Sequence, residues 1–126
     1  METVVVSDTN IFIDLLNIDM LGALFNTSLI IHTTDFVINE LIDDEQRRCI
    51  DSFVDCGKLF VKQFDAKELS DLLYEKNRCN NNMTLVDCSV YVYAKTNSLR
   101  LLTGDRKLRS YADRNNTTVS GILFFV

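Results

Sequence analysis

The sequence lacks proline, internal repeats and low-complexity tracts, so nothing in it marks a linker between domains. It also lacks a run of about 18 apolar residues, which argues against a membrane-spanning helix. The opening METVVVSD has no basic stretch and reaches a charged residue too early for a secretory signal peptide. With 126 residues, of which 47% are hydrophobic, we expect one globular domain spanning residues 1–126.

The single histidine and the four cysteines do not have the spacing of a structural metal site. His32 stands alone, and Cys49, Cys56, Cys79 and Cys88 include no CxxC pair. A structural zinc site is therefore not expected. The cysteines fall in segments with helical patterns, which favours reduced thiols packed in the core of a cytoplasmic protein. We expect His32 to have a structural packing role as well.

Charged residues are unevenly distributed along the chain, whose formal net charge is −5. Residues 1–87 hold 7 Lys and Arg against 16 Asp and Glu, a net of −9. Residues 88–126 hold 6 against 2, a net of +4. A basic C-terminal third could hold a polyanion beside an acidic pocket. Ordinary solvated surface charge explains the same distribution, and charge alone favours that explanation.

The hydrophobic pattern predicts alternating strands and helices, and hence an α/β fold with a mostly parallel sheet covered on both faces. Strands are expected at residues 3–7, 28–31, 59–64, 99–102 and 118–126. Helices are expected at residues 11–16, 44–56, 85–95 and 105–114, with two more beginning near residues 34 and 65. A loop is expected at residues 80–82.

Side chains that can cap helices stand at several of these boundaries. They are Asn10 or Thr9 for the first helix, Thr33 or Thr34 for the second, and Asp65 with Glu68 for the helix that carries Leu69, Leu72 and Leu73. In the second helix, the apolar residues expected to face inward are Phe36, Val37, Leu41 and Ile42.

Four acidic residues lie either at turns from a strand to a helix or within predicted helices. They are Asp8 in VVVSDTN, Glu40 in FVINELI, Asp87 in TLVDCSV and Asp105 in LLTGDRK. Each lies beside apolar sequence, where an isolated buried carboxylate would be costly. Ligands of parallel sheets bind outside the carboxyl ends of the strands. Asp8 and Asp105 directly follow strands, so both should project towards that edge. Spacing alone does not place Glu40 and Asp87, which lie on helices.

Each carboxylate also has an ordinary structural explanation. Asp8 can form an Asx-turn or cap the first helix, and Asp105 can cap the last one. Asp87 completes the capping-box pattern Thr84-x-x-Asp87. Glu40 can be a solvated helix residue like its acidic neighbours. The coincidence of four such positions, in order and with suitable flanks, favours one shared site.

Four segments of the chain match a known pattern: VVVSDTNIFIDLL, IHTTDFVINELI, TLVDCSVYVYAKTNSLRLLTGDRKLR and the tail SGILFFV. Together they cover essentially the whole chain, and it resembles the PIN-domain ribonucleases, the family of most toxins in VapBC-like type II toxin–antitoxin systems. The resemblance implies a three-layer α/β/α sandwich in which Asp8, Glu40, Asp87 and Asp105 line one acidic pocket.

The resemblance also implies supporting residues around that pocket. Asn10 and Thr103 match positions that often support ligands or a catalytic water. Thr84 matches a small hydroxyl residue that caps the helix of Asp87. This chain has Thr where Ser is more usual, a replacement that preserves the cap.

The resemblance implies an endoribonuclease. The hard oxygen ligands of such a pocket suit Mg²⁺ or Mn²⁺, so we expect the activity to require one of these ions. One or two bound ions would activate a water for in-line attack on phosphorus. Asp8, Asp87 and Asp105 are the expected metal ligands, directly or through water. Glu40 is either a further ligand or a base on the attacking water, and the sequence does not separate these roles.

The resemblance extends to RNA and protein partners. Arg106, Lys107 and Arg109 either hold the RNA backbone or form the exposed face of an amphipathic helix. A toxin would have a cognate antitoxin whose C-terminal peptide crosses the acidic pocket and places a basic side chain there, and it would form a homodimer. Two alternatives are a housekeeping RNA-processing nuclease without an antitoxin and a non-catalytic module that retains the fold.

Overall fold

The computed structural model describes residues 3–79 and 83–121, which form a five-stranded, all-parallel sheet with the order β3-β2-β1-β4-β5. The strands are β1 (Thr3–Ser7), β2 (Leu29–Thr34), β3 (Leu59–Lys62), β4 (Arg100–Leu102) and β5 (Val119–Ser120). The helices are α1 (Thr9–Asn17), α2 (Leu21–Phe25), α3 (Asp35–Glu40), α4 (Asp44–Asp55), α5 (Ala66–Arg78), α6 (Leu85–Thr96) and α7 (Arg106–Arg114).

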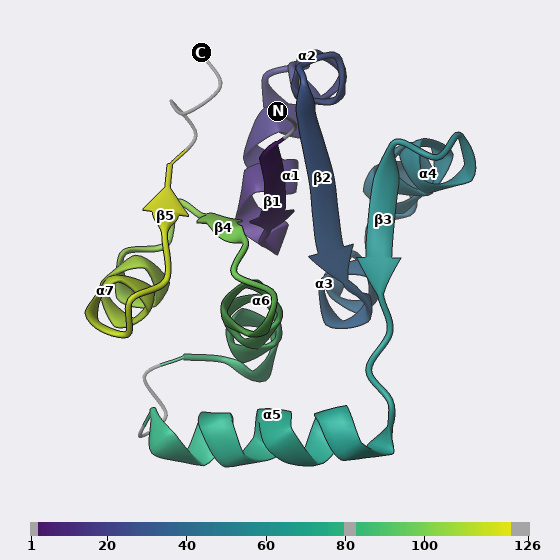
Figure 1. Ribbon diagram of the computed structural model, residues 1–126. Helices are drawn as coiled ribbons and strands as arrows, with labels where there is room; N and C mark the ends of the chain where they lie inside the picture. The colour runs from purple at the N-terminus through teal and green to yellow at the C-terminus, as the bar shows by residue number, and fades with distance from the viewer. Residues whose placement is uncertain (1–2, 80–82, 122–126) are drawn as a thin grey trace.

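Helices surround the sheet in the layered arrangement that the sequence predicts (Figure 1). The helix α6 packs against β1, β2 and β4, and α5 lies against α6 on the side away from the sheet. The remaining helices contact the strands next to them in sequence: α2 and α3 contact β2, α4 contacts β3, and α7 contacts β5. The fold is therefore the expected α/β/α sandwich. No helix in the described ranges has the length and apolar character needed to cross a bilayer.

The central strand β1 is buried on both faces. Val5 and Val6 are both 0% exposed, although successive side chains of a strand point to opposite faces. Val5 lies opposite Ile31 of β2, and Val6 lies opposite Leu101 of β4. Because both faces are covered, β1 is a continuous apolar run without alternating polar residues, as is usual for parallel sheets.

The helix α6 is apolar on most of its circumference because it lies between the sheet and α5. Cys88, Ser89, Val90 and Tyr91 are four consecutive buried residues, which together span more than one helix face. A helix with only one buried face would place some of these side chains in solvent. The position of α6 fixes the direction from which Asp87, in its first turn, approaches the sheet.

Helix caps follow the sequence signals at most boundaries. Thr34 caps α3, and Asp65 with Glu68 forms a complete capping box at α5. Thr84 caps α6 and Asp105 caps α7, as expected. At α1 the capping side chain belongs to Asp8, one of the three residues that the sequence offered, and not to Thr9 or Asn10. The helix starts earlier than the apolar pattern predicts, so Thr9 and Asn10 form its first turn.

Several other expectations differ from the structure at element ends. The second helix ends at Glu40, which leaves Ile42 in the connection to α4 with 89% of its surface exposed instead of facing inward. Strand β2 continues to Thr34, three residues beyond the expected end, because it pairs with β3 up to Lys62. The last strand is Val119–Ser120, shorter than expected, since Thr118 and Gly121 lie outside it. Residues 122–126 and the expected loop at 80–82 lie outside the described residues.

The histidine has the expected packing role. His32 lies within β2, its Nδ1 is 2.8 Å from the Tyr93 hydroxyl, and its ring contacts the rings of Tyr93 and Phe60. Burial lowers the pKa of His32, so the ring is neutral near pH 7.

The cysteines are all free thiols, as expected, but they do not all pack in the core. Cys79 and Cys88 are buried, Cys49 is half-buried, and Cys56 is exposed beyond the last turn of α4, so the core prediction was wrong for Cys56. Burial raises the pKa of the Cys88 thiol to about 12.

Candidate active site

Asp8 is the most deeply buried carboxylate of the predicted site, with 2% of its surface exposed. It directly follows β1, and its Oδ1 accepts a 3.0 Å hydrogen bond from the Ile11 backbone N–H at the start of α1. Its Oδ2 accepts a hydrogen bond from the Thr103 hydroxyl. The carboxylate is therefore held in one orientation by a helix N-terminus and by the chain that leaves β4.

Thr103 connects two of the predicted carboxylates. Its hydroxyl donates to Asp8 and accepts a 3.0 Å hydrogen bond from the backbone N–H of Asp105. Asp105 in turn caps α7, because its Oδ1 accepts from the Leu108 N–H at 3.0 Å. The backbone N–H of Asp8 also donates to the Leu102 carbonyl at 3.3 Å. The carboxyl ends of β1 and β4 thus form one hydrogen-bonded unit, with Asp8 and Asp105 on either side of Thr103.

Asp87 lies half-buried in the first turn of α6 and participates in a capping box. Its carboxylate accepts from the Thr84 backbone N–H at 3.3 Å, and the Thr84 hydroxyl accepts from the Asp87 N–H at 3.1 Å. Burial raises the pKa of Asp87; the two hydrogen bonds with Thr84 oppose that rise, and the negative charges of Asp105 and Glu40 add to it. Asp87 therefore does cap the N-terminus of α6, as its ordinary structural explanation requires. It also lies within reach of the negative charges of Asp105 and Glu40.

The environment of Asp8 is also acidic. Burial raises the pKa of Asp8 to about 6, the hydrogen bonds from Thr103 and Ile11 oppose the rise, and the charges of Asp87 and Asp105 add to it. Because Asp87 and Asp105 act on Asp8 and on each other, the three carboxylates share one electrostatic environment. That environment disfavours the ionised forms of Asp8 and Asp87, so a cation would be stabilised beside them.

Glu40 and Asn10 lie at the margin of this group. Glu40 is exposed at the last residue of α3, and its charge acts on Asp87. Asn10 is exposed in the first turn of α1. Within residues 3–79 and 83–121, no three His, Cys, Asp or Glu side chains are grouped closely enough to form a ready-made metal site. The carboxylates therefore do not converge on one point, although the charges of Asp105 and Glu40 act on Asp87.

The donor set of this region fits Mg²⁺ or Mn²⁺. All of its candidate ligands are carboxylate oxygens, which suit hard divalent cations. Mg²⁺ usually binds through one or two carboxylates and keeps several waters, so it does not need three converging side chains. The raised pKa of the buried Asp8 adds an independent reason, because a nearby cation offsets the cost of keeping this carboxylate ionised.

Hydroxyl groups outside the predicted set of site residues hold the surrounding elements together. Ser89 of α6 and Thr34, the cap of α3, have their hydroxyl oxygens 2.8 Å apart. The Thr33 hydroxyl donates to the Ser7 carbonyl at 2.9 Å, which joins the ends of β2 and β1. A buried serine in an otherwise apolar helix was the available sequence signal for Ser89.

A further carboxylate at this edge was also missed. Asp35 begins α3 directly after β2, and its Oδ1 is buried with no hydrogen-bond partner in the described part of the chain. Like Asp8, it is the first acidic residue after an apolar strand, which is the signal that could have identified it. The Thr9 hydroxyl, next to Asp8, is buried without a partner among the same residues.

The predicted RNA-binding residues lie on the exposed surface of α7. Arg106, Lys107 and Arg109 follow Asp105 and are all exposed. Arg106 and Lys107 line an open hollow of about 300 Å³ together with Tyr111 and Arg114. The amphipathic explanation is therefore correct for this helix, and the same exposed face is available to a phosphate backbone.

Comparisons with known proteins agree with this architecture. The sequence profile described as DUF3368, a PIN domain, matches residues 4–126. No curated protein matches the sequence significantly.

Similar solved structures include PAE2754 from Pyrobaculum aerophilum, with 16% identity, a TM-score of 0.63 and coverage of 98% of this chain and 93% of that one. VapBC2 from Rickettsia felis, bound to a DNA fragment from its promoter, matches with 17% identity, a TM-score of 0.62 and coverage of 94% and 98%. FitAcB from Neisseria gonorrhoeae matches with 16% identity, a TM-score of 0.54 and coverage of 91% and 95%.

Proposed function

Because this chain belongs to the PIN-domain family, whose members are nucleases, we propose that it is a metal-dependent endoribonuclease that hydrolyses RNA phosphodiester bonds. The observation that carries the proposal is the shared acidic environment of Asp8, Asp87 and Asp105 at the carboxyl edge of the sheet. A buried carboxylate whose pKa is raised beside two further acids is a frequent property of functional sites.

The three buried or half-buried carboxylates would hold Mg²⁺ or Mn²⁺, directly or through water. When bound, the metal supplies activation of a water and stabilisation of negative charge on the phosphate. Thr103 keeps the Asp8 carboxylate oriented, and the Thr84 cap keeps Asp87 in the first turn of α6. Glu40, exposed beside this group, can accept a proton from the attacking water or complete the ligand set.

The RNA backbone would lie across the start of α7. Arg106, Lys107 and Arg109 directly follow Asp105, so phosphates bound by these cations would lie near the acidic group. An acidic protein with this small basic surface would select RNA mainly through local shape and sequence rather than through bulk charge.

We further propose that the protein is the toxin of a type II toxin–antitoxin pair. The sequence resembles the family of most toxins in VapBC-like systems, and the fold is similar to that of VapBC2 and of FitAcB. A cognate antitoxin would insert a basic side chain among the carboxylates, where burial and the negative charges of Asp87 and Asp105 raise the pKa of Asp8. Four free cysteines fit a reducing cytoplasm, and a homodimer is the expected assembly.

RNA cleavage by the purified protein tests the nuclease proposal. The wild type and the Asp8→Asn variant are prepared identically and incubated with RNA in Mg²⁺, in Mn²⁺ and in EDTA. We expect cleavage that requires metal and is absent from the variant. Equal cleavage by both proteins would identify a contaminating ribonuclease. No cleavage by a folded wild type that binds metal would favour a non-catalytic module.

A further inference from the structure

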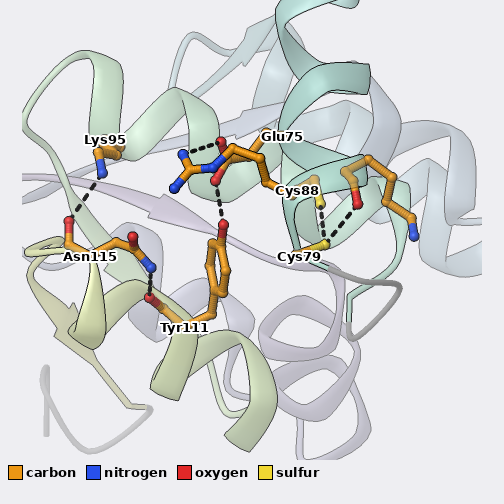
Figure 2. A network of polar contacts seen from close by, with 8 residues as sticks. Glu75, Cys79, Cys88, Lys95, Tyr111 and Asn115 are labelled. Carbon is orange, nitrogen blue, oxygen red and sulfur yellow. Dashed lines mark hydrogen bonds and ion pairs between the residues drawn. The ribbon is translucent and has the colours of Figure 1, made fainter.

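The thiols of Cys79 and Cys88 contact each other beside the candidate active site. Their Sγ atoms are 3.9 Å apart, and both residues are buried, with exposed fractions of 3% and 0% (Figure 2). Cys79 ends α5, whereas Cys88 lies in the second turn of α6 and directly follows Asp87. The other two cysteines, Cys49 and Cys56, belong to α4 and its end.

The end of α5 is held firmly in this position. The buried Glu75, one turn before Cys79, accepts a 2.6 Å hydrogen bond from the Tyr111 hydroxyl of α7 and lies 3.3 Å from the Arg78 guanidinium (Figure 2). The Cys79 thiol itself donates to the Lys76 carbonyl at 3.1 Å. Because α5 is joined to α7 here, closing the gap between the two sulfurs draws on the first turn of α6 as well as on the end of α5.

We propose that Cys79 and Cys88 form a redox-sensitive dithiol, which a peroxide converts to a disulfide that displaces Asp87 and switches the active site off. The effect on cleavage rests on the proposed nuclease function. The disulfide itself does not, because it follows from the contact between the two thiols.

The reaction balances with hydrogen peroxide as the oxidant. Peroxide transfers one oxygen atom to the Cys79 sulfur and leaves as water, which gives a sulfenic acid. The Cys88 sulfur then attacks the Cys79 sulfur, the S–O bond breaks, and the hydroxyl departs with the Cys88 proton as a second water. Two thiols are oxidised by two electrons in total, and peroxide is reduced to two waters. Cys79 is the first target because it is the less buried of the two thiols, whereas burial keeps the Cys88 thiol protonated.

Closing the disulfide has a geometric consequence for Asp87. A disulfide has an S–S distance of about 2.05 Å, so the sulfurs must approach from 3.9 Å by roughly 2 Å. Asp87 is the residue next to Cys88, and its carboxylate is held by the backbone N–H of Thr84 in the same turn. A displacement of about 1 Å at a reacting group can lower a rate about a hundredfold. We therefore expect a loss of this size on oxidation, reversed by reductant.

Peptide mapping of the wild type tests the dithiol without any variant. The protein is treated with peroxide, remaining thiols are alkylated, and the product is digested with trypsin and chymotrypsin. Trypsin releases residues 79–95 as one peptide, and chymotrypsin divides it after Leu85, between the two cysteines. We expect the two fragments to stay joined until dithiothreitol is added. Free or separately oxidised Cys79 and Cys88, with no joined fragments, would overturn the proposal.

RNA cleavage before and after peroxide tests the switch. We expect the wild type and the Cys56→Ala control to lose activity about a hundredfold and to recover it with dithiothreitol. Cys79→Ala and Cys88→Ala should retain their activity after the same treatment. A joined pair with undiminished cleavage would refute the regulatory role. If the reduced wild type cleaves no RNA, the nuclease proposal fails. Peptide mapping of the wild type and of Asp87→Asn still decides whether the disulfide forms.

Discussion

At the scale of single residues, the Asp8 carboxylate has little compensation for its charge. Within the described residues, its side-chain oxygens accept hydrogen bonds from two neutral donors, the Ile11 N–H and the Thr103 hydroxyl. Burial removes most of its contact with water. Its raised pKa means that the folded protein without metal holds this group ionised at a cost. Such a cost in the free protein is what a bound cation would offset.

Replacing Asp8 with Asn should stabilise the metal-free protein at neutral pH. The folded pKa of about 6 lies above the ordinary value of 3.8, so the folded state binds the proton more tightly and ionisation destabilises it. This penalty is absent below pH 3.8, grows between the two values and is complete above pH 6. At about 1.4 kcal/mol per pKa unit, Asp8→Asn should gain about 3 kcal/mol at pH 7 in EDTA, measured by urea unfolding.

The matched control for that measurement is Asp14→Asn, which removes an exposed carboxylate from the same helix. Its effect should stay within about 0.5 kcal/mol at either pH, as for most surface substitutions. The gain of Asp8→Asn should disappear near pH 3.5. A variant that is less stable than the wild type at pH 7 in EDTA would show that Asp8 is not under electrostatic strain.

Thr103→Val should weaken both the fold and the site. The change keeps the side chain's shape but leaves the Asp8 Oδ2 without its donor and the Asp105 N–H without its acceptor. Unsatisfied buried polar groups cost about 1–3 kcal/mol each, so we expect a loss of that order in unfolding free energy. RNA cleavage should fall with it. Thr118→Val, at an exposed threonine, provides the comparison, and equal effects of the two changes would contradict the assigned role.

At the scale of elements, the ends of strands and helices position the site. Asp8 caps α1, Asp105 caps α7 and Asp87 completes the capping box of α6, so three of the four predicted carboxylates belong to helix N-termini. The capping boxes of α5 and α6 were predictable from the spacing of two residue types. The cap of α1 was not, because Asp8, Thr9 and Asn10 are all good caps and only the packed structure selects among them.

The cap of α6 can be tested separately from the chemistry. Thr84→Ala removes the hydroxyl that accepts from the Asp87 N–H, whereas Thr84→Ser keeps it. We expect the alanine variant to lose about 1 kcal/mol of unfolding free energy and the serine variant to remain near the wild type. Thermal or urea unfolding measures both. Equal stability of the two variants would mean that the capping box contributes nothing to the start of α6.

The exposed cations of α7 should contribute to RNA affinity through their charge. Neutralising one phosphate contact with single-stranded nucleic acid changes the slope of log K against log salt by about 0.7. Lys107→Ala should therefore weaken binding at low salt and reduce that slope, with cleavage-deficient Asp8→Asn as the background and fluorescence anisotropy as the measurement. Arg48→Ala, an exposed cation of α4, is the control. Identical slopes for Lys107→Ala and its parent would exclude this helix from the interface.

At the scale of the whole molecule, the sequence was sufficient for the architecture but not for the site. Alternating apolar segments predicted an α/β/α sandwich, because strands buried on both faces, such as β1, must be covered by helices. The order β3-β2-β1-β4-β5 brings the ends of β1 and β4 together, which places Asp105 beside Asp8. Strand spacing does not encode how far α3 and α6 tilt towards that edge. The exposed Glu40 and the half-buried Asp87 therefore became distinguishable only in the folded chain.

The central claim is that carboxylates from three separate elements act as one metal site. The most direct measurement is a Mn²⁺ titration in which electron paramagnetic resonance detects the bound ion. It compares the wild type with Asp8→Asn, Asp87→Asn and Asp105→Asn. Asp113→Asn, at an exposed residue of α7, serves as the control. We predict that the wild type and the control bind Mn²⁺ and that each of the other three variants loses affinity. Binding that survives all three substitutions, or a folded wild type that binds no Mn²⁺, would contradict the account.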